Sequence, residues 1–276
     1  MRTGTPSIEG RRGYAFSGYV RPHRGLTLSH CGVASLHPPL ALTQARGSRG
    51  PCGRPPDMTN TISGKIWLMI FCDYGIVLMR RPLRESDRIV TVFTLEHGKL
   101  EVNFKGVRLA KGKLRALSEA FSWGDYRFYL KKGSNFPVCT GGRTLSVFGG
   151  IRQDLDRIYM AQHYCEVVNK LTPAASPSPE KYDLLLGALD DLDACGTAFW
   201  LRRAFTLRAL DLAGFGFRET ATGPEAELWD TLHAGSWTAV RALPDDERAA
   251  VFIDGLFSRF FSGQVDINLR TLPFVK

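Results

Sequence analysis

The chain has 276 residues, of which 44% are hydrophobic, and it carries a formal net charge of +9. This length suffices for one large domain or two modest ones, and the composition is that of an ordinary globular protein. No apolar run approaches the roughly 18 residues that a membrane-spanning helix needs, so the sequence predicts no membrane span.

The first part of the chain, residues 1–68, shows no helical or strand period that persists. Arg, Gly, Pro and Ser make up 29 of residues 1–57, and Lys is absent from them. Such a stretch buries too little apolar surface to offset its ordering entropy. We expect residues 1–68 to be a disordered extension, an organellar transit peptide, or the product of a start site assigned too far upstream, with Met58 or Met69 as the true start. The composition favours the last of these.

The next part alternates apolar and polar residues with the period of β-strands. A strand is predicted over residues 74–83, and a hairpin over residues 87–106 around the turn sequence EHGK, in which His97 is interpreted as a turn residue. Two further strand-like runs follow, at residues 122–142 and 143–148. Four or five short strands within about 75 residues predict a small barrel, and a basic five-stranded barrel is typical of the OB-fold, which binds oligonucleotides.

Positive charge is concentrated in this part of the chain. Residues 79–132 hold 13 Lys and Arg against 6 acids, a net charge of +7, whereas residues 133–276 have a net charge of −4. The sequence therefore predicts a basic module with a polyanionic partner, followed by a mildly acidic module.

The most basic stretch is FKGVRLAKGKLRAL, residues 104–117, which has five cations and no acid. It is not a nucleotide-binding P-loop, because five residues instead of four separate Gly106 from Gly112 and Leu114 replaces the Ser or Thr that would hold Mg²⁺. The alternatives are a solvated loop and a contact to DNA phosphates, and the charge of the module favours phosphate contact. The predicted contacts are Lys105, Arg108, Lys111, Lys113 and Arg115, with Arg80, Arg81, Arg84, Lys131 and Lys132 as candidate extensions of the same track.

Aromatic residues alternate within these strands, and some are placed where bases could be stacked. A small barrel also needs aromatic side chains to fill its interior, so core packing is the favoured prediction for each one. The residues concerned are Phe104, Trp123, Tyr126, Phe128 and Tyr129.

From residue 149 the pattern becomes helical, with apolar residues at the spacing of one helix face. Helices are predicted over residues 150–172, from Pro179 with Ser178 as its N-cap, over 197–213, and around 225–232 and 244–261. The third is apolar nearly all round, which predicts a central buried helix that ends at Gly214. The fold class predicted is α+β: a five-stranded barrel in residues 69–148 followed by an all-helical domain in residues 149–276.

Catalytic and metal-binding patterns find little support. The six cysteines include no C-x-x-C pair, and no nucleophile or zinc-protease motif is present, so we predict a non-enzyme without metal or cofactor. Acidic residues in the helical part are interpreted as solvated helix exteriors or helix N-terminal partners, namely Asp154, Asp156, Asp190, Asp191 and Asp193. Two alternatives stay open: a protein-interaction scaffold without a nucleic-acid role, and, less favoured, a metal-dependent nuclease that uses these carboxylates.

An ordered set of motifs resembles the RecO family of bacterial recombination mediators. The set comprises RRPLRESDR (residues 80–88), TLEHGK (94–99), KGVR (105–108), FGGIR (148–152) and the central helix LRRAFTLRALDLAGFGF (201–217). The resemblance covers residues 71–276 and is weak beyond residue 217. It implies an OB-fold and a helical domain, binding to single- and double-stranded DNA, annealing of complementary strands, and recombinase loading onto strands coated by single-strand-binding protein.

The resemblance also implies two protein partners, RecR and the acidic C-terminal tail of single-strand-binding protein, and a bacterial cytoplasmic location at the nucleoid during repair. A tail that ends in a carboxylate needs a cation beside an apolar pocket. Arg202, Arg203 and Arg208 are the candidates for this contact, with pairing to Asp190, Asp191 or Asp193 as the alternative. Many members carry a four-cysteine zinc module after the central helix. Residues 212–230 contain no cysteine, so the chain resembles the zinc-free branch.

Overall fold

The computed structural model describes residues 69–109, 114–134, 136–216, 226–263 and 269–271. The prediction for residues 1–68 lies outside the described residues. So do Lys111 and Lys113, two of the predicted phosphate contacts.

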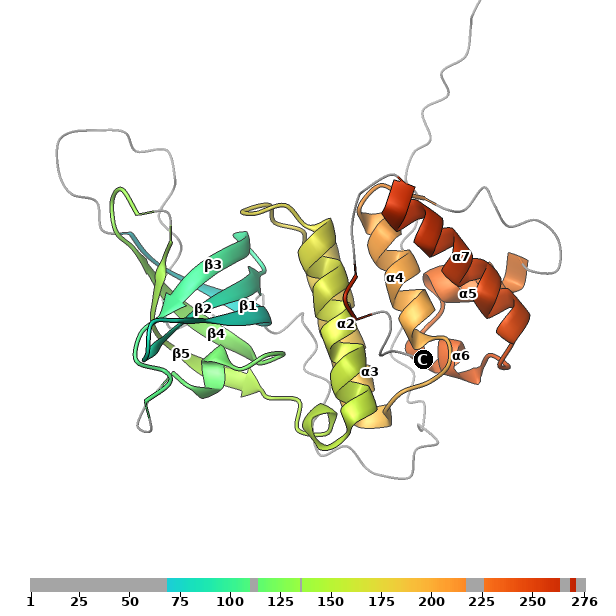
Figure 1. The fold of residues 1–276 in the computed structure, drawn as a ribbon, viewed down its shortest axis with the longest axis horizontal. Helices are drawn as coiled ribbons and strands as arrows, with labels where there is room; N and C mark the ends of the chain where they lie inside the picture. The colour runs from blue at the N-terminus through green and yellow to red at the C-terminus, as the bar shows by residue number, and fades with distance from the viewer. Residues whose placement is uncertain (1–68, 110–113, 135, 217–225, 264–268, 272–276) are drawn as a thin grey trace, which may run out of the picture. The chain divides into compact units, whose positions relative to one another are not determined.

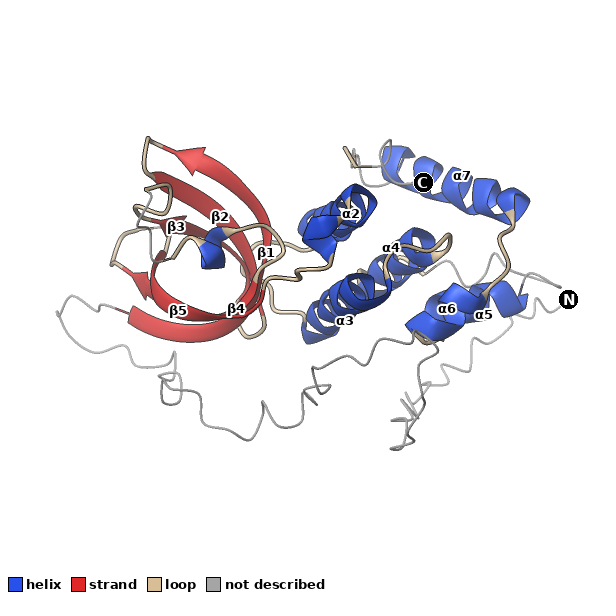
Figure 2. Ribbon diagram, turned by 90° about the horizontal axis from the view of Figure 1, so that it is seen from below, coloured by secondary structure: helices blue, strands red, loops and turns tan. Residues whose placement is uncertain are grey.

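Five strands form a closed barrel, which Figure 2 shows as a ring. The strands are joined in the order β1-β2-β3-β5-β4, with antiparallel pairing throughout except between β3 and β5, where Asn103 pairs with Val138. The predicted five-stranded barrel is therefore confirmed. The strands span β1 Met69–Leu83, β2 Asp87–Thr94, β3 Gly98–Phe104, β4 Trp123–Leu130 and β5 Val138–Ser146.

The two faces of strands β1 and β2 belong to different cores. Side chains such as Val90 and Val92 point into the barrel and pack there with Phe104, Tyr126 and Phe128. Their neighbours on the other face, Ile76, Leu78 and Phe93, join the core of the helical region. Because both faces are covered, β2 is buried over its last six residues instead of alternating between core and solvent.

The hairpin turn between β2 and β3 is organised by a buried carboxylate. Asp73 accepts hydrogen bonds at 3.1 Å from the backbone N–H groups of Glu96 and His97, and its Oδ2 lies 2.7 Å from Nδ1 of His97. The side chain of Asp73 is only 1% exposed. A buried carboxylate requires such partners, and here they fix the turn, so the interpretation of His97 as a turn residue is confirmed.

The first two residues of β3, which follow this turn, attach the barrel to the helices. Gly98 has φ +70°, and a Cβ on it would lie 2.4 Å from the backbone of Ser176. Lys99 donates from Nζ to the backbone oxygen of Asn169, 2.5 Å away, near the end of helix α2 (Leu155–Leu171). A cation near the C-terminal carbonyl groups of a helix is favourable. The EHGK sequence thus forms a joint between the barrel and α2.

Helices make up the rest of the described chain (Figure 1). The predicted helix starts hold to within a few residues, and Ser178 is the N-cap of α3 as predicted, although its side chain makes no capping hydrogen bond. The 3₁₀ turns and α6 were not predicted, because they are too short to show a period. The remaining elements are the 3₁₀ turns Ala116–Ser118 and Ile151–Gln153, and helices α3 Pro179–Cys195, α4 Leu201–Leu212, α5 Ala226–Ala234, α6 Trp237–Ala242 and α7 Glu247–Gly263.

Helix α4 is the centre of the helical core, as its all-round apolar sequence predicts. It contacts α2, α3, α5, α6 and α7, and its residues from Leu201 to Leu207 are all buried. It ends at Leu212, two residues before Gly214, whose φ of +90° is suited to glycine.

Candidate nucleic-acid interface

Four arginines line one open pocket of about 240 Å³ on the barrel. Arg80 and Arg81 come from the end of β1, Arg88 from the start of β2, and Arg108 from the loop that follows β3. Pro82 completes the lining. Arginines from three parts of the chain therefore line one space, and the guanidinium group of an arginine is suited to a phosphate because it presents a planar fork of donors.

The loop that carries Arg108 is fastened to the turn between β1 and β2. Asp87 Oδ1 accepts from the backbone N–H of Gly106 at 2.8 Å and from Ser86 Oγ at 3.0 Å, and Arg108 N donates to Ser86 O at 3.0 Å. The hydrogen bond from Gly106 holds the pKa of Asp87 below its usual value. The sequences ESD and KGVR, which are distant along the chain, thus form one rigid base for the pocket.

The pocket arginines have acidic neighbours of unequal burial. Glu119 accepts from both Arg80 and Arg88, the latter at 2.8 Å, while Arg81 lies 3.3 Å from Glu101. The side chains of Arg80 and Arg81 are 40% and 51% exposed. Exposed ion pairs contribute little stability, so the contacts of Arg80 and Arg81 can be exchanged for contacts with a polyanion, whereas the side chain of Arg88 is only 18% exposed.

Glu119 remains ionised despite its partial burial. Burial alone raises the pKa of this carboxyl, but the hydrogen bond from Arg88 and the charges of Arg80, Arg88 and Arg152 outweigh it, so its pKa lies below the usual value. Neither Arg88 nor Glu119 was among the predicted site residues. Arg88 lies inside a motif that the sequence singled out, whereas Glu119 has no signal in the sequence, because its partners are 31 and 39 residues away.

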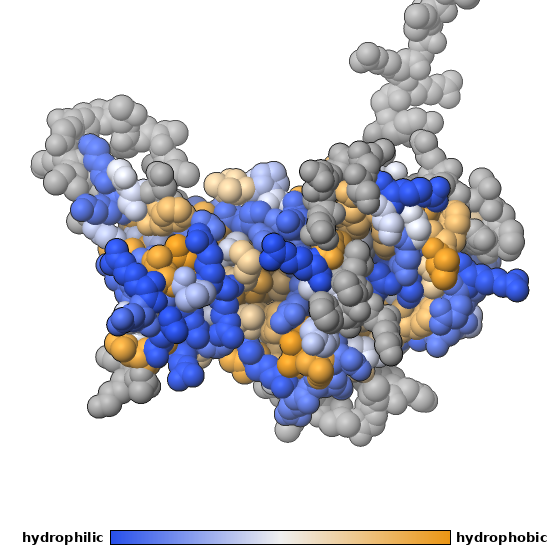
Figure 3. All heavy atoms as spheres, viewed as in Figure 1, coloured by the Kyte–Doolittle hydropathy of each residue, from blue (hydrophilic) through white to orange (hydrophobic). Residues whose placement is uncertain are grey.

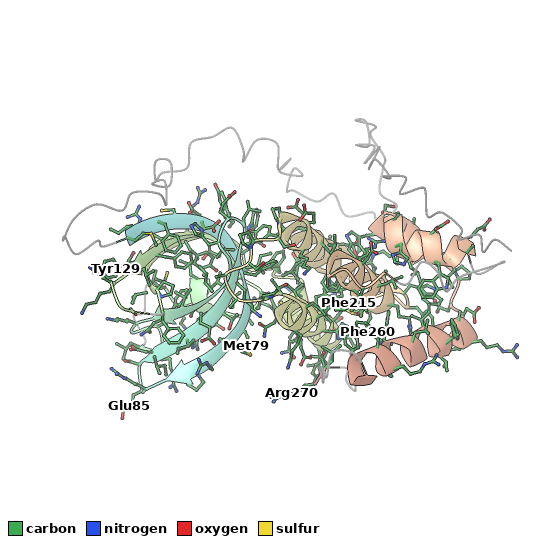
Figure 4. The ribbon with its side chains drawn as sticks, turned by 90° about the horizontal axis from the view of Figure 1, so that it is seen from above. Met79, Glu85, Tyr129, Phe215, Phe260 and Arg270 are labelled. Atoms are coloured by element: carbon green, nitrogen blue, oxygen red, sulfur yellow. The ribbon has the colours of Figure 1, made fainter. Side chains whose placement is uncertain are left out.

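The other predicted cations are exposed but differ in position. Arg84, Lys105 and Arg115 are exposed around the pocket turn and loop. Lys131 follows Leu130, which pairs with Met69 at the opposite end of β1 from the pocket, and Lys132 comes next. Figure 4 likewise shows Glu85 of the pocket turn and Tyr129 on different sides of the barrel. The structure brings Arg80, Arg81 and Arg108 together and leaves Lys131 and Lys132 apart from them.

Figure 3 shows the surface of the barrel in one view as largely hydrophilic, interrupted by a few apolar side chains. Phe104, Tyr126 and Phe128 do not contribute to that surface, because they are fully buried. Trp123 is half-buried and donates from Nε1 to the hydroxyl of Tyr182, 3.0 Å away. Core packing is thus confirmed for the three fully buried residues, and Trp123 faces the helical region.

Two of the three arginines proposed for a partner tail are buried in the helical core. Arg202 and Arg203 donate to the same oxygen of Asp254 on α7, at 2.7 and 2.9 Å, and each side chain is 7% exposed. The expected alternative partners, Asp190, Asp191 and Asp193, do not fill this role. Asp254 is 52 and 51 positions further along the chain than the two arginines, which is why no local pattern revealed it.

The third, Arg208, is bound to backbone carbonyl groups at the end of α5. It donates to the backbone oxygens of Leu232 and Gly235, each at 2.7 Å, and its guanidinium lies 4.4 Å from the ring centre of Trp237. These contacts satisfy carbonyl groups that the end of a helix leaves without intrahelical partners. Arg208 is therefore a structural cap for α5.

The helical carboxylates also have structural roles. Asp191 pairs with Arg241 at 2.6 Å, and Asp193 Oδ1 accepts from the backbone N–H of Ile151 at 2.9 Å. Asp154 caps α2 by accepting from Asp156 N, as expected of a helix N-terminal partner. Asp193 accepts from the first backbone N–H of the 3₁₀ turn Ile151–Gln153, which agrees with the alternative of a helix N-terminal partner. The half-buried Asp191 fits neither interpretation, because it pairs with Arg241.

Within the described ranges, no group of three or more His, Cys, Asp or Glu side chains is placed to hold a metal ion. Cys139 and Cys165 are buried, and burial raises the pKa of each thiol to about 12. Residues 217–225, part of the cysteine-free stretch on which the prediction of a zinc-free chain rests, lie outside the described residues. None of the described helices is both long and apolar enough to span a membrane.

Comparisons with known proteins match both parts of the chain. The family model described as recombination protein O N terminal matches residues 69–148, and the one described as recombination protein O C terminal matches residues 152–223. A DNA repair protein RecO of Streptomyces coelicolor is 36% identical over 250 residues, which cover 76% of this chain and 100% of that protein.

Other relatives match over a shorter span. The DNA repair protein RecO of Streptomyces griseus is 34% identical over 155 residues, and that of Listeria monocytogenes is 30% identical over 140 residues. These matches cover 54% and 51% of this chain, and they span 62% and 54% of the respective relatives.

Proposed function

The chain belongs to the RecO family of DNA repair proteins, and from this premise we propose that it is a non-catalytic mediator that binds and anneals DNA strands. In this role it helps a recombinase to load onto strands coated by single-strand-binding protein. The arginine pocket, formed by Arg80, Arg81, Arg88 and Arg108 with Pro82, is the observation that carries the proposal, because four arginines line one space and guanidinium groups are suited to binding phosphate.

Binding through the pocket and its loop is proposed to be independent of base sequence. Phosphate contacts position a protein on nucleic acid, whereas contacts to base edges specify sequence. The buried aromatic residues of the barrel favour the phosphate contacts further, since Phe104, Tyr126 and Phe128 present no ring to a base. Single- and double-stranded DNA share the phosphate backbone, so both are proposed ligands.

The chain is proposed to divide its work between residues 69–148, which bind DNA, and residues 149–276, which contact protein partners. RecR and the acidic tail of single-strand-binding protein are the proposed partners, on the strength of the family. We do not assign the tail to Arg202, Arg203 or Arg208, because their internal partners favour a structural role. The proposed place of action is the bacterial nucleoid during repair.

The test is the salt dependence of binding to a single-stranded oligonucleotide. Replacing Lys105, Arg108, Lys111 and Lys113 together with Ala should flatten the slope of log K against log salt by roughly 2 to 3, at about 0.7 for each phosphate that is no longer neutralised. Folding should be nearly unaffected, because exposed charges contribute little to stability. The control replaces Lys131 and Lys132, which lie away from the pocket, and should change the slope less.

An unchanged slope in the quadruple variant would show that the loop is solvated and does not touch the strand. A parent chain that binds no DNA at any salt concentration would favour a protein scaffold. Loss of the labelled strand in the presence of Mg²⁺, seen on a gel, would instead indicate a nuclease.

A further inference from the structure

Glu119 bridges two strands of the barrel from the segment that follows the 3₁₀ turn Ala116–Ser118. Its Oε1 accepts from Arg88 of β2 at 2.8 Å, and its Oε2 accepts from Arg80 of β1. Arg88 is held further by Ser118 Oγ at 3.2 Å. One carboxylate therefore neutralises two of the four arginines that line the pocket.

The pocket nevertheless keeps an excess of positive charge. Arg80 and Arg88 share Glu119, Arg81 contacts Glu101, and Arg108 donates to the backbone oxygen of Arg84 at 3.1 Å. Four guanidinium groups thus meet two carboxylates. A guanidinium has five N–H donors, so each pocket arginine can still donate to a further oxygen.

We propose that Glu119 is the resident counter-charge of the arginine pocket, and that a phosphodiester group of a nucleic-acid strand displaces it from Arg80 and Arg88. Carboxylates and phosphates are accepted by the same fork of guanidinium donors, so the two anions compete for one site. The inference deepens the proposed function and rests on it, because it names how one phosphate of the strand is held.

The surroundings of Glu119 allow this exchange without leaving a half-buried carboxylate unpartnered. The side chain of Glu119 is 26% exposed, and the charge of Arg152 already stabilises its ionised form. Arg152 is fixed by hydrogen bonds of 2.6 Å to the backbone oxygens of Val147 and Ala120. Arg152 therefore supplies a positive neighbour for Glu119 while Arg80 and Arg88 turn to the phosphate.

The same arrangement makes the pocket selective for a strand over a small anion. A free anion must displace Glu119 by its own contacts alone. A strand that is already held by the exposed Lys105 of the loop, outside the pocket lining, presents its next phosphates to the pocket at high effective concentration. Glu119 therefore raises the concentration of anion that is needed to occupy the pocket, and a multivalent ligand reaches that concentration locally.

The experiment compares Glu119→Gln with Glu85→Gln in the full chain, using a single-stranded oligonucleotide over a series of salt concentrations. Both variants lose one negative charge, but Glu85 is an exposed residue of the pocket turn and pairs with no arginine among the described residues. Glu119→Gln should bind several-fold more tightly than the parent, and its salt slope should steepen by about 0.7 for each freed arginine. Glu85→Gln should keep the parent slope.

Glu119→Asp guards against a folding defect in the Gln variant. Its side chain keeps the negative charge but is shorter by one methylene, which draws the carboxylate back from Arg80 and Arg88, so we expect a slope between those of the parent and Glu119→Gln. Inorganic phosphate, titrated at constant ionic strength without the strand, should bind Glu119→Gln at lower concentrations than the parent, because the counter-charge no longer competes.

A slope for folded Glu119→Gln or Glu119→Asp that equals the parent's, or weaker binding by either, would overturn the inference and identify Glu119 as a support that positions the arginines. An effect confined to inorganic phosphate, without any change in strand binding, would also overturn it. These outcomes are distinct from failure of the proposed function, which would appear as absent DNA binding by the parent chain.

Discussion

Arginines serve opposite purposes in the two regions of this chain. In the barrel, the side chains of Arg80 and Arg81 are 40% and 51% exposed, and each contacts a different acid, Glu119 or Glu101. In the helical region, Arg202 and Arg203 are almost fully buried and bind one carboxylate at short distance. The residue type is the same, but its surroundings decide whether the charge is available to a ligand or used to hold the fold.

The difference has a physical basis in the cost of moving a charge out of water. A buried guanidinium must be paired, and removal of its partner leaves an uncompensated charge. An exposed guanidinium is already solvated, so its partner contributes little to stability and can be exchanged. Variants in the two regions should therefore separate effects on folding from effects on DNA binding.

The largest effect is expected from Asp254→Ala. This change leaves Arg202 and Arg203 buried without their shared carboxylate, and should lower the free energy of unfolding by about 3 kcal/mol, since one third of the Asp254 side chain is exposed and the penalty is at the lower end for a buried pair. Urea unfolding measures it. Asp230→Ala, an exposed change on α5, serves as the control. A decrease of less than about 1 kcal/mol, the range of exposed ion pairs, would show that water reaches the two arginines freely.

Arg208→Ala should have the next largest effect on stability. It removes the side chain that donates to the backbone oxygens of Leu232 and Gly235, and hydrogen bonds to a charged group contribute roughly 1.5 to 3 kcal/mol. We expect a decrease of about 2 kcal/mol in unfolding free energy, near the middle of that range. The salt slope of DNA binding by the folded variant should match the parent's, and a flatter slope would contradict the structural role.

Acid should weaken the helical region through His163. This side chain is fully buried between Thr271 Oγ1 and Thr206 Oγ1, each 3.0 Å from a ring nitrogen, and burial lowers its pKa from 6.5 to about 3, with the charge of Arg202 adding to the effect. The folded state therefore binds the proton less well than the unfolded state. The contribution of this group to stability is fully present above pH 6.5 and disappears as pH falls toward 3.

Between pH 7 and pH 5 the decrease should be about 2 kcal/mol, at about 1.36 kcal/mol for each pH unit below the unfolded pKa of about 6.5. Chemical denaturation at the two pH values measures it. His163→Gln, which stays neutral, should reduce this pH dependence, and an equal dependence in parent and variant would assign the acid sensitivity to other groups.

The smallest effect on folding is expected from Arg81→Ala. Its side chain is 51% exposed and lies 3.3 Å from Glu101, so stability should change by less than about 0.5 kcal/mol. Its role in the pocket should appear in the salt slope on single strands, which we expect to flatten by about 0.7. A marked decrease in stability with an unchanged slope would show that Arg81 supports the fold and does not contact DNA.

The sequence was sufficient to predict most helices and strands, but it did not reveal which side chains contact one another. Alternation and 3.6-residue periods are local, so the five strands and the long helices could be found from them. The contacts that define the pocket join residues such as Arg80 and Glu119, 39 positions apart, and no period encodes such a pair. The family motifs supplied part of this missing information, because RRPLRESDR and KGVR are joined by hydrogen bonds beneath the arginine pocket.

The same reasoning explains why the sequence led to two competing expectations for α4. Its apolar sequence correctly predicted a buried helix, and a buried helix leaves little room for free arginines. The competing expectation, a tail-binding surface at Arg202 and Arg203, depended on their charge alone. Their partner Asp254 lies on the last helix, and only the assembled fold brings it to them.

The junction between β3 and β5 is the weakest of the five strand junctions in the barrel, because it has the fewest aligned residue pairs. Asn103 pairs there with Val138, its backbone N–H donates to Pro137 O at 2.9 Å, and its buried Oδ1 has no hydrogen-bond partner among the described residues. The antiparallel junctions each hold seven or eight aligned pairs. Amide protons of the β3–β5 seam should therefore exchange with solvent ahead of those in β1 and β2, because local opening follows the segments with the fewest cooperative bonds. The barrel would then open locally between β3 and β5, while the hydrogen bonds of its other four strand pairs remain intact.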